Sequence, residues 1–137
     1  TYYYLEMSGY GAVSYTLTVS KSGSEGSKNN PVELTLSTAH SGTIDNVDLS
    51  WDNGYSYYKF TTSAADNYTL TMTNSDELGC YLYSNASFTT YVNYCIDGAN
   101  ISRTFLALSA NTNYYLNIDG MSSTVKTTTY DITVAPD

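Results

Sequence analysis

The sequence predicts an all-β, antiparallel β-sandwich with an additional β-hairpin at its N-terminal end. First, the 137 residues include 16 tyrosines while only 13% of residues are charged, and β-branched and aromatic side chains suit a pleated, half-buried sheet. Second, apolar and polar residues alternate with a period of two along most of the chain. Third, Gly, Asn and Asp residues separate the alternating segments, as turns require.

Residues 2–19 form the predicted hairpin, and their sequence is echoed near the end of the chain. Residues 1–9 (TYYYLEMSG) resemble residues 112–120 (TNYYLNIDG), and a Tyr-x-Leu/Ile-Thr-Val motif follows both, at 15–19 and 130–134. The chain is therefore expected to begin with the closing hairpin of one repeat and to continue with a whole domain of the same kind. The alternative is a chance likeness of two Tyr/Thr hairpins. The apolar residues proposed for assembly contacts are Tyr3, Leu5, Met7, Val13, Tyr15, Leu17 and Val19.

A polar, Gly/Ser-rich stretch separates this hairpin from the rest of the chain. We expect residues 1–20 to be the hairpin, 21–30 a linker closed by Pro31, and 31–137 the sandwich. Short strands at this spacing are typical of an antiparallel sandwich. Strands are predicted in the segments 32–36, 55–62, 68–73, 78–83, 91–96, 101–108, 114–119 and 128–134.

Two cysteines, Cys80 and Cys95, lie in neighbouring strand-like segments with a polar turn at residues 85–87 between them. A hairpin would bring them opposite one another, so we predict a disulfide bond and an oxidising compartment. The alternative is two free thiols. The spacing of the two cysteines and His40 does not fit a tetrahedral metal site.

Charge and motifs exclude several classes of function. A net charge of −8 would repel nucleic acid and anionic membranes, and no apolar run is long enough to span a bilayer. His40 is the only histidine, and no nucleophile, phosphate-binding or metalloprotease motif occurs. We expect a non-catalytic extracellular or cell-surface protein, without membrane insertion, from which a leader or an upstream domain has been removed.

Outward-facing aromatic residues are the candidates for ligand binding. If the apolar residues of each strand face the core, then Tyr81, Tyr83 and Tyr115 face outward, and Trp51 lies near a loop. Tyrosine combines a large contact area with a polar tip, which suits both protein interfaces and polysaccharides. The competing interpretation is cross-strand stabilisation alone.

Several short motifs resemble bacterial pre-peptidase C-terminal domains. Glu25, the pair Asn29 and Asn30, residues 41–45 (SGTID) and residues 57–60 (YYKF) are similar to the beginning of such domains. Residues 82–84, 113–116 and 130–134 look like their middle and closing strands. The resemblance covers residues 25–135 and implies a jelly-roll-like sandwich, similar to the collagen-binding domains of bacterial collagenases. It also implies a non-catalytic module attached to a secreted enzyme or a surface protein.

Domains of this family sometimes bind calcium, but the chain departs from the family pattern at residues 26–28 and 51–54, where that site would lie. Oxygen ligands suit a hard cation such as calcium, and acidic loop residues that are merely solvated are the alternative. The candidate ligands are Glu25, Asn29, Asp45, Asp48 and Asp52.

Two hypotheses for the function follow. In the first, the module joins copies of itself or adjacent repeats into a filament or tandem array, with the hairpin as donor strands on a neighbouring sheet edge. In the second, it is a collagen- or polysaccharide-binding accessory domain of a secreted hydrolase or adhesin, and exposed tyrosines bind the ligand.

Overall fold

A computed structural model describes residues 25–46, 54–74, 77–120 and 126–137. The described residues form nine β-strands and no helix, which confirms the predicted all-β class. Nothing helical in these ranges could therefore cross a membrane. The strands are β1 (Val32–Glu33), β2 (His40–Asn46), β3 (Tyr55–Thr61), β4 (Asp66–Asn74), β5 (Leu78–Tyr83), β6 (Tyr91–Gly98), β7 (Ile101–Leu108), β8 (Asn113–Gly120) and β9 (Lys126–Pro136).

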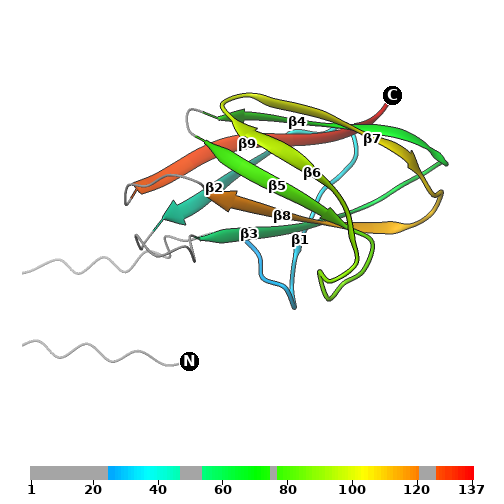
Figure 1. Ribbon diagram of the computed structural model, residues 1–137, viewed down its shortest axis with the longest axis horizontal. Helices are drawn as coiled ribbons and strands as arrows, with labels where there is room; N and C mark the ends of the chain where they lie inside the picture. Colours follow the sequence, from blue (N-terminus) through cyan, green and yellow to red (C-terminus); the bar gives the residue numbers. More distant parts are fainter. Residues whose placement is uncertain (1–24, 47–53, 75–76, 121–125) are drawn as a thin grey trace, which may run out of the picture.

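The strands form two sheets that lie face to face (Figure 1). One sheet has the order β1-β3-β8-β5-β6, and the other has the order β2-β9-β4-β7. Every pair is antiparallel except β1 and β3, which run parallel. This arrangement confirms the predicted antiparallel sandwich.

The core lies between the sheets because alternate residues of each strand face inward. Tyr58 and Phe60 of β3 are fully buried, as are Leu70 of β4 and Ile132 of β9. Burial of a large apolar side chain stabilises the fold by about 1.5–3 kcal/mol. The residues between these positions face the outside, so the five-stranded sheet presents tyrosines to its surroundings and the four-stranded sheet presents threonines.

Residues Glu25–Asn30, within the segment expected to be a linker, lie against β3. The amide of Tyr57 donates to the carbonyl of Glu25 at 2.8 Å, and the amide of Glu25 donates to Oγ of Ser56 at 2.9 Å. The Glu25 carboxylate lies 2.7 Å from Nε2 of His40 on β2. This segment is therefore bonded to strands of both sheets.

Cys80 and Cys95 are direct partners in the register of β5 and β6. Cys80 is fully buried in the core. The pairing of the two strands thus has the register that the predicted disulfide needs, and the bond itself stays a prediction.

Candidate functional site

Six tyrosines on the outer surface of the five-stranded sheet form a group that we call the tyrosine face, and Tyr94 of β6, the register partner of Tyr81, stands beside them. Five of the six alternate with buried core residues on β3, β5 and β8, and the sixth stands on the edge strand β6. Five are half-buried, whereas Tyr91 is 53% exposed. The members are Tyr55, Tyr57, Tyr81, Tyr83, Tyr91 and Tyr115.

The strand register arranges these side chains in rows that cross the sheet. Tyr115 on β8 is the partner of Tyr83 on β5, and Tyr83 is the partner of Tyr91 on β6. In the next row, Asn117 stands between Tyr57 and Tyr81. The Oδ1 atom of Asn117 is buried and accepts no hydrogen bond from any described residue. The face is thus mostly aromatic, with an amide near its middle.

Phe88, in the loop between β5 and β6, packs on this face. Its ring centroid lies 5.0 Å from that of Tyr57, 5.6 Å from that of Tyr83 and 5.5 Å from that of Tyr115, all edge to face. Tyr83 makes a further edge-to-face contact with Tyr91 at 6.3 Å. Edge-to-face aromatic pairs contribute about 0.5–1.5 kcal/mol each beyond burial, so these rings hold one another in fixed orientations.

The hydroxyl groups of Tyr57 and Tyr83 remain protonated near neutral pH. Burial raises the pKa of Tyr57, and the neighbouring Tyr55 and Tyr83 raise it further. Burial also raises the pKa of Tyr83, with added effects of Tyr81 and Tyr91. The hydroxyl groups of Tyr57 and Tyr83 can therefore both donate and accept a hydrogen bond with a ligand.

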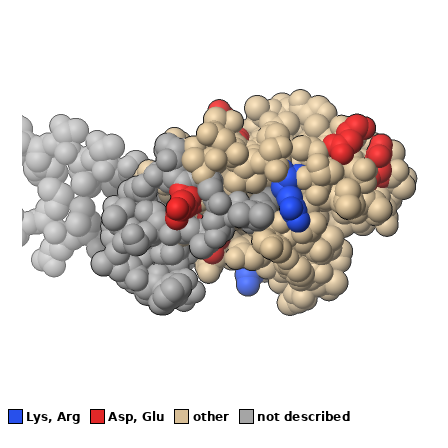
Figure 2. Space-filling view, turned by 45° about the horizontal axis from the view of Figure 1, so that its top comes forward, with Lys and Arg blue, Asp and Glu red and all other residues tan. Residues whose placement is uncertain are grey.

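Charged residues also accompany these aromatic residues. Asp119 stands in the same row as Tyr55, and Cζ of Arg103 lies 5.9 Å from the centroid of the Tyr94 ring. Lys59, in the same row as Tyr115, pairs with Glu33 of β1 at 2.8 Å. Figure 2 shows charged side chains sparsely scattered over the described surface in that view. At the β6 edge, Val92 is 40% exposed and Tyr94 is 47% exposed. The face and its edge are therefore mainly aromatic and partly apolar, with few charged groups, and they suit a ligand of the same character.

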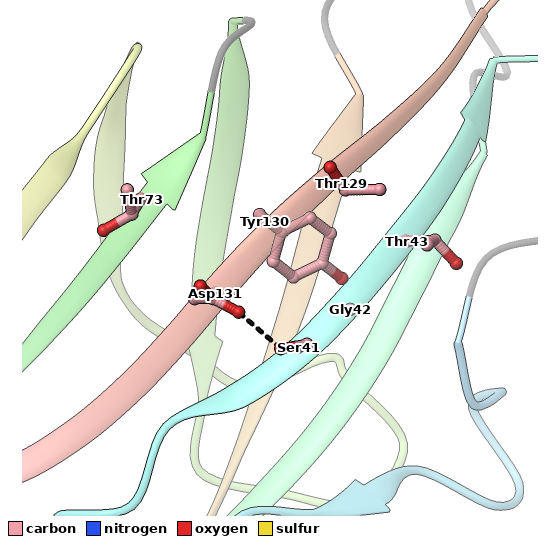
Figure 3. Close-up of a pocket in the computed structure, with 7 residues that line it drawn as sticks. All are labelled: Ser41, Gly42, Thr43, Thr73, Thr129, Tyr130 and Asp131. Carbon is pink, nitrogen blue, oxygen red and sulfur yellow. Dashed lines mark hydrogen bonds between the residues drawn. The ribbon is translucent and has the colours of Figure 1, made fainter.

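The opposite sheet carries a different surface, with a shallow hollow of about 330 Å³ (Figure 3). It is lined by Ser41, Gly42 and Thr43 of β2, by residues 129–131 of β9, and by Thr73 of β4. Oγ of Ser41 donates to Oδ1 of Asp131 at 2.5 Å across its floor. Because its hydroxyl groups lie on a flat strand surface, this hollow offers a ligand little enclosed contact area.

The structure brings together three of the four predicted ligand-binding residues, Tyr81, Tyr83 and Tyr115. Trp51 lies outside the described residues. Sequence reasoning missed Tyr55, Tyr57, Tyr91 and Phe88. The alternation that places Tyr58 and Phe60 inward would have revealed Tyr55 and Tyr57, because they occupy the intervening positions.

The predicted calcium ligands are only partly described. The Glu25 carboxylate contacts His40 Nε2 and accepts a hydrogen bond from the Tyr58 hydroxyl at 3.3 Å. Asp48 and Asp52 lie outside the described residues, and so does the side chain of Asp45. Within the described ranges, no three His, Cys, Asp or Glu side chains gather closely enough to hold a metal. Calcium binding by Glu25, Asn29 and the three aspartates stays a prediction.

The predicted assembly residues fall outside the part of the chain that the structure describes. These residues are Tyr3, Leu5, Met7, Val13, Tyr15, Leu17 and Val19. Their role in assembly stays a prediction.

Comparisons with known proteins support the fold. No protein-family model matches the sequence, and no curated protein matches it. Among solved structures, the pre-peptidase C-terminal domain of a collagenase from Bacillus anthracis is similar, with a TM-score of 0.58 and 20% identity over 77% of this chain and 95% of that one. The periplasmic inhibitor of g-type lysozyme PliG from Aeromonas hydrophila is similar with a TM-score of 0.57 and 11% identity, over 78% of this chain and 96% of that one. The chain therefore has the β-sandwich fold of a pre-peptidase C-terminal domain, as its sequence motifs predicted.

Proposed function

We propose that the protein is a non-catalytic extracellular binding module that docks through its tyrosine face on an extended, proline-rich protein such as a collagen-like polypeptide. One observation carries this proposal: six tyrosines share the outer surface of one sheet, where Phe88 packs against three of them. Tyrosine offers a large, rigid contact area at a low cost in side-chain entropy.

The chemistry of the face favours a polypeptide ligand. Proline-rich segments adopt a preformed polyproline II helix and dock on aromatic-lined surfaces, because little conformational entropy is lost when they bind. The tyrosine hydroxyls and the Asn117 amide add groups that hydrogen-bond to the backbone of an extended chain. The two similar structures support a protein ligand: one belongs to a collagenase, and the other inhibits a lysozyme.

Binding to insoluble collagen, with cellulose and chitin in parallel, tests the proposal. Replacement of Tyr83 or Tyr115 by alanine should weaken binding to collagen about tenfold or more, because central aromatic residues usually dominate such interfaces. The replacement Thr129→Ala, on the opposite sheet, is the matched control and should leave binding unchanged. Binding should also depend little on salt, because the face offers few charges.

Equal retention of the wild-type protein and the two tyrosine variants would contradict the proposal. Retention on cellulose or chitin but not on collagen would point to a polysaccharide ligand instead.

A second candidate function is assembly with copies of itself or with adjacent repeats. The observation that favours it is strand β6, with Tyr91, Val92 and Tyr94 exposed. In the described part of the chain, only β5 pairs with β6, so its outer backbone groups face away from the sheet. An exposed edge strand with apolar side chains is a template for strand addition.

The oligomeric state tests this second candidate. Size-exclusion chromatography should show a species larger than one chain, and removal of residues 1–20 should reduce it to a monomer. A full chain that is monomeric at all concentrations would exclude assembly by strand addition.

A further inference from the structure

Phe88 is buried outside the core of the sandwich. It is 7% exposed, yet it does not belong to the cluster of residues packed between the two sheets. Its neighbours are Tyr57, Tyr83 and Tyr115 on the outer surface of the five-stranded sheet. A loop side chain thus covers the middle of the tyrosine face.

The loop that carries Phe88 has an unusual backbone. The φ angle of Phe88 is 54°, a left-handed conformation that bulky residues rarely adopt. Such a conformation persists only when the surroundings compensate for its strain. Here the surroundings are the three tyrosines that the Phe88 ring contacts and Asn85, which accepts three amides of the loop.

The hydrogen bonds of residues 84–90 join residues of this loop to one another. Oδ1 of Asn85 accepts the amides of Thr89 at 3.0 Å and Thr90 at 2.8 Å. The carbonyl of Asn85 accepts the amide of Phe88 at 3.1 Å, and the carbonyl of Thr90 accepts the amide of Ser84 at 3.0 Å. Among the described residues, none of the hydrogen bonds of residues 84–90 reaches the tyrosine face. The loop is therefore a self-contained unit that the Phe88 ring attaches to the face.

We propose that the place of the Phe88 ring, between Tyr57, Tyr83 and Tyr115, is the anchor site of the tyrosine face. A prolyl or aromatic ring of the partner takes this place when the loop lifts away, and Phe88 occupies it in the free protein. This inference rests on the proposed function for its partner, but the anchor site itself follows from the aromatic contacts. Because Phe88 occupies the anchor site in the free protein, the apparent affinity for the partner is the intrinsic affinity multiplied by the fraction of molecules in which the site is open.

The replacement Phe88→Ala tests the anchor with two probes. The first probe is p-cresol, a single aromatic ring, followed through the amide chemical shifts of the protein. It should bind the variant saturably and perturb Tyr57, Tyr83 and Tyr115, whereas the wild-type protein should bind it weakly. The second probe is a soluble Pro-Pro-Gly repeat peptide, which should bind the variant about tenfold more tightly than the wild-type protein.

Two further variants serve as controls. Phe88→Leu keeps an apolar side chain on the face and should give intermediate binding, and Thr129→Ala should behave as the wild-type protein. Thermal unfolding of Phe88→Ala should stay cooperative, because Phe88 lies outside the core.

The outcomes separate this inference from the proposed function. If the variant takes up no p-cresol at the three tyrosines, or binds the peptide no more tightly than the wild-type protein does, the anchor site is wrong. If the peptide binds neither protein, the proposed function fails, and the p-cresol titration alone then decides on the anchor site.

Discussion

The hydroxyl groups of Tyr58 and Tyr130 lie 2.6 Å apart and join the two sheets through a buried hydrogen bond. Tyr58 belongs to β3 and Tyr130 to β9, and their rings meet edge to face at 6.4 Å. The Tyr58 hydroxyl also donates to Oε2 of Glu25, which contacts His40 of β2. A polar cluster thus lies between the two sheets and ties residue 25 to both of them.

The two tyrosines should make the fold sensitive to alkali. Burial raises the pKa of Tyr130 from 10 to about 12, although hydrogen bonding with Ser56 and Tyr58 acts in the opposite direction. Burial also raises the pKa of Tyr58, and Tyr130 and Glu25 add to the rise. Because the folded state holds these protons more tightly than the unfolded state does, their stabilisation is complete below pH 10 and is lost as the pH rises towards about 12.

Urea unfolding at a series of pH values measures this effect. Between pH 10 and about 12, each tyrosine should lower the unfolding free energy by up to about 1.4 kcal/mol per pH unit. The double variant Tyr58→Phe, Tyr130→Phe should lose less stability over this range. Equal slopes for the two proteins would show that other groups govern the alkaline transition.

Gly42 should tolerate no side chain, because it stands opposite Tyr130 in the register of β2 and β9. A Cβ atom at this position would come within 2.5 Å of the Tyr58 hydroxyl and 2.8 Å of the Tyr130 ring. The replacement Gly42→Ala should therefore lower the unfolding free energy by about 1–3 kcal/mol.

A double-mutant cycle checks this cause. Since Tyr58→Phe removes the atom nearest to the new methyl group, the double variant should lose less stability than the sum of the two single variants. If the stability losses of the two single variants simply add, the strain does not come from contact with the Tyr58 hydroxyl.

Much of this architecture could be read from the sequence, because alternation with a period of two reports directly which side chains face the core. It placed Tyr58, Phe60, Leu70 and Met72 inward, and all four are buried. Strand β2 is harder to find by this rule, since Gly42 occupies an inward position where an apolar side chain would be expected. The alternation therefore predicts no strand at residues 41–45, which enter only through the family resemblance.

The role of Phe88 could not be predicted in this way. It lies in a loop, where no periodicity applies, and its position on the tyrosine face depends on a left-handed backbone and on the hydrogen bonds of Asn85.

The predicted strand at residues 32–36 is shorter than its alternation indicates. The strand register with β3 includes only Val32 and Glu33, followed by one hydrogen bond from the Leu34 amide to the Lys59 carbonyl, and the backbone turns with a positive φ of 59° at Ser37.

The predicted disulfide between Cys80 and Cys95 should contribute to stability. The bond would close the loop between residues 80 and 95, and this should raise the unfolding free energy by about 3 kcal/mol, because it restricts the unfolded chain. The mass of the alkylated protein with and without prior reduction measures the bond, and thermal unfolding with and without reductant measures its effect. Modification of both thiols before reduction would show that the bond is absent.

The beginning of the stable domain provides the last prediction. The amide and carbonyl of Glu25 bond to Ser56 and Tyr57, and its carboxylate contacts His40 and Tyr58. A variant without residues 1–24 keeps these contacts, so it should unfold cooperatively. A variant without residues 1–30 leaves the Tyr57 amide and the Tyr58 hydroxyl without these acceptors, so its unfolding free energy should be lower by about 1–3 kcal/mol.

The replacement Glu25→Ala in the full chain separates the two kinds of contact. It removes the carboxylate but keeps the backbone hydrogen bonds, so its loss of stability should be smaller than that caused by removing residues 1–30. Urea unfolding of the two truncated variants and of Glu25→Ala gives their unfolding free energies, which can then be ranked. The chain that begins at Pro31 could prove as stable as the chain that begins at Glu25. The bonds of Glu25 would then contribute nothing to stability, and the sandwich would begin at residue 31, as the composition of residues 21–30 predicts.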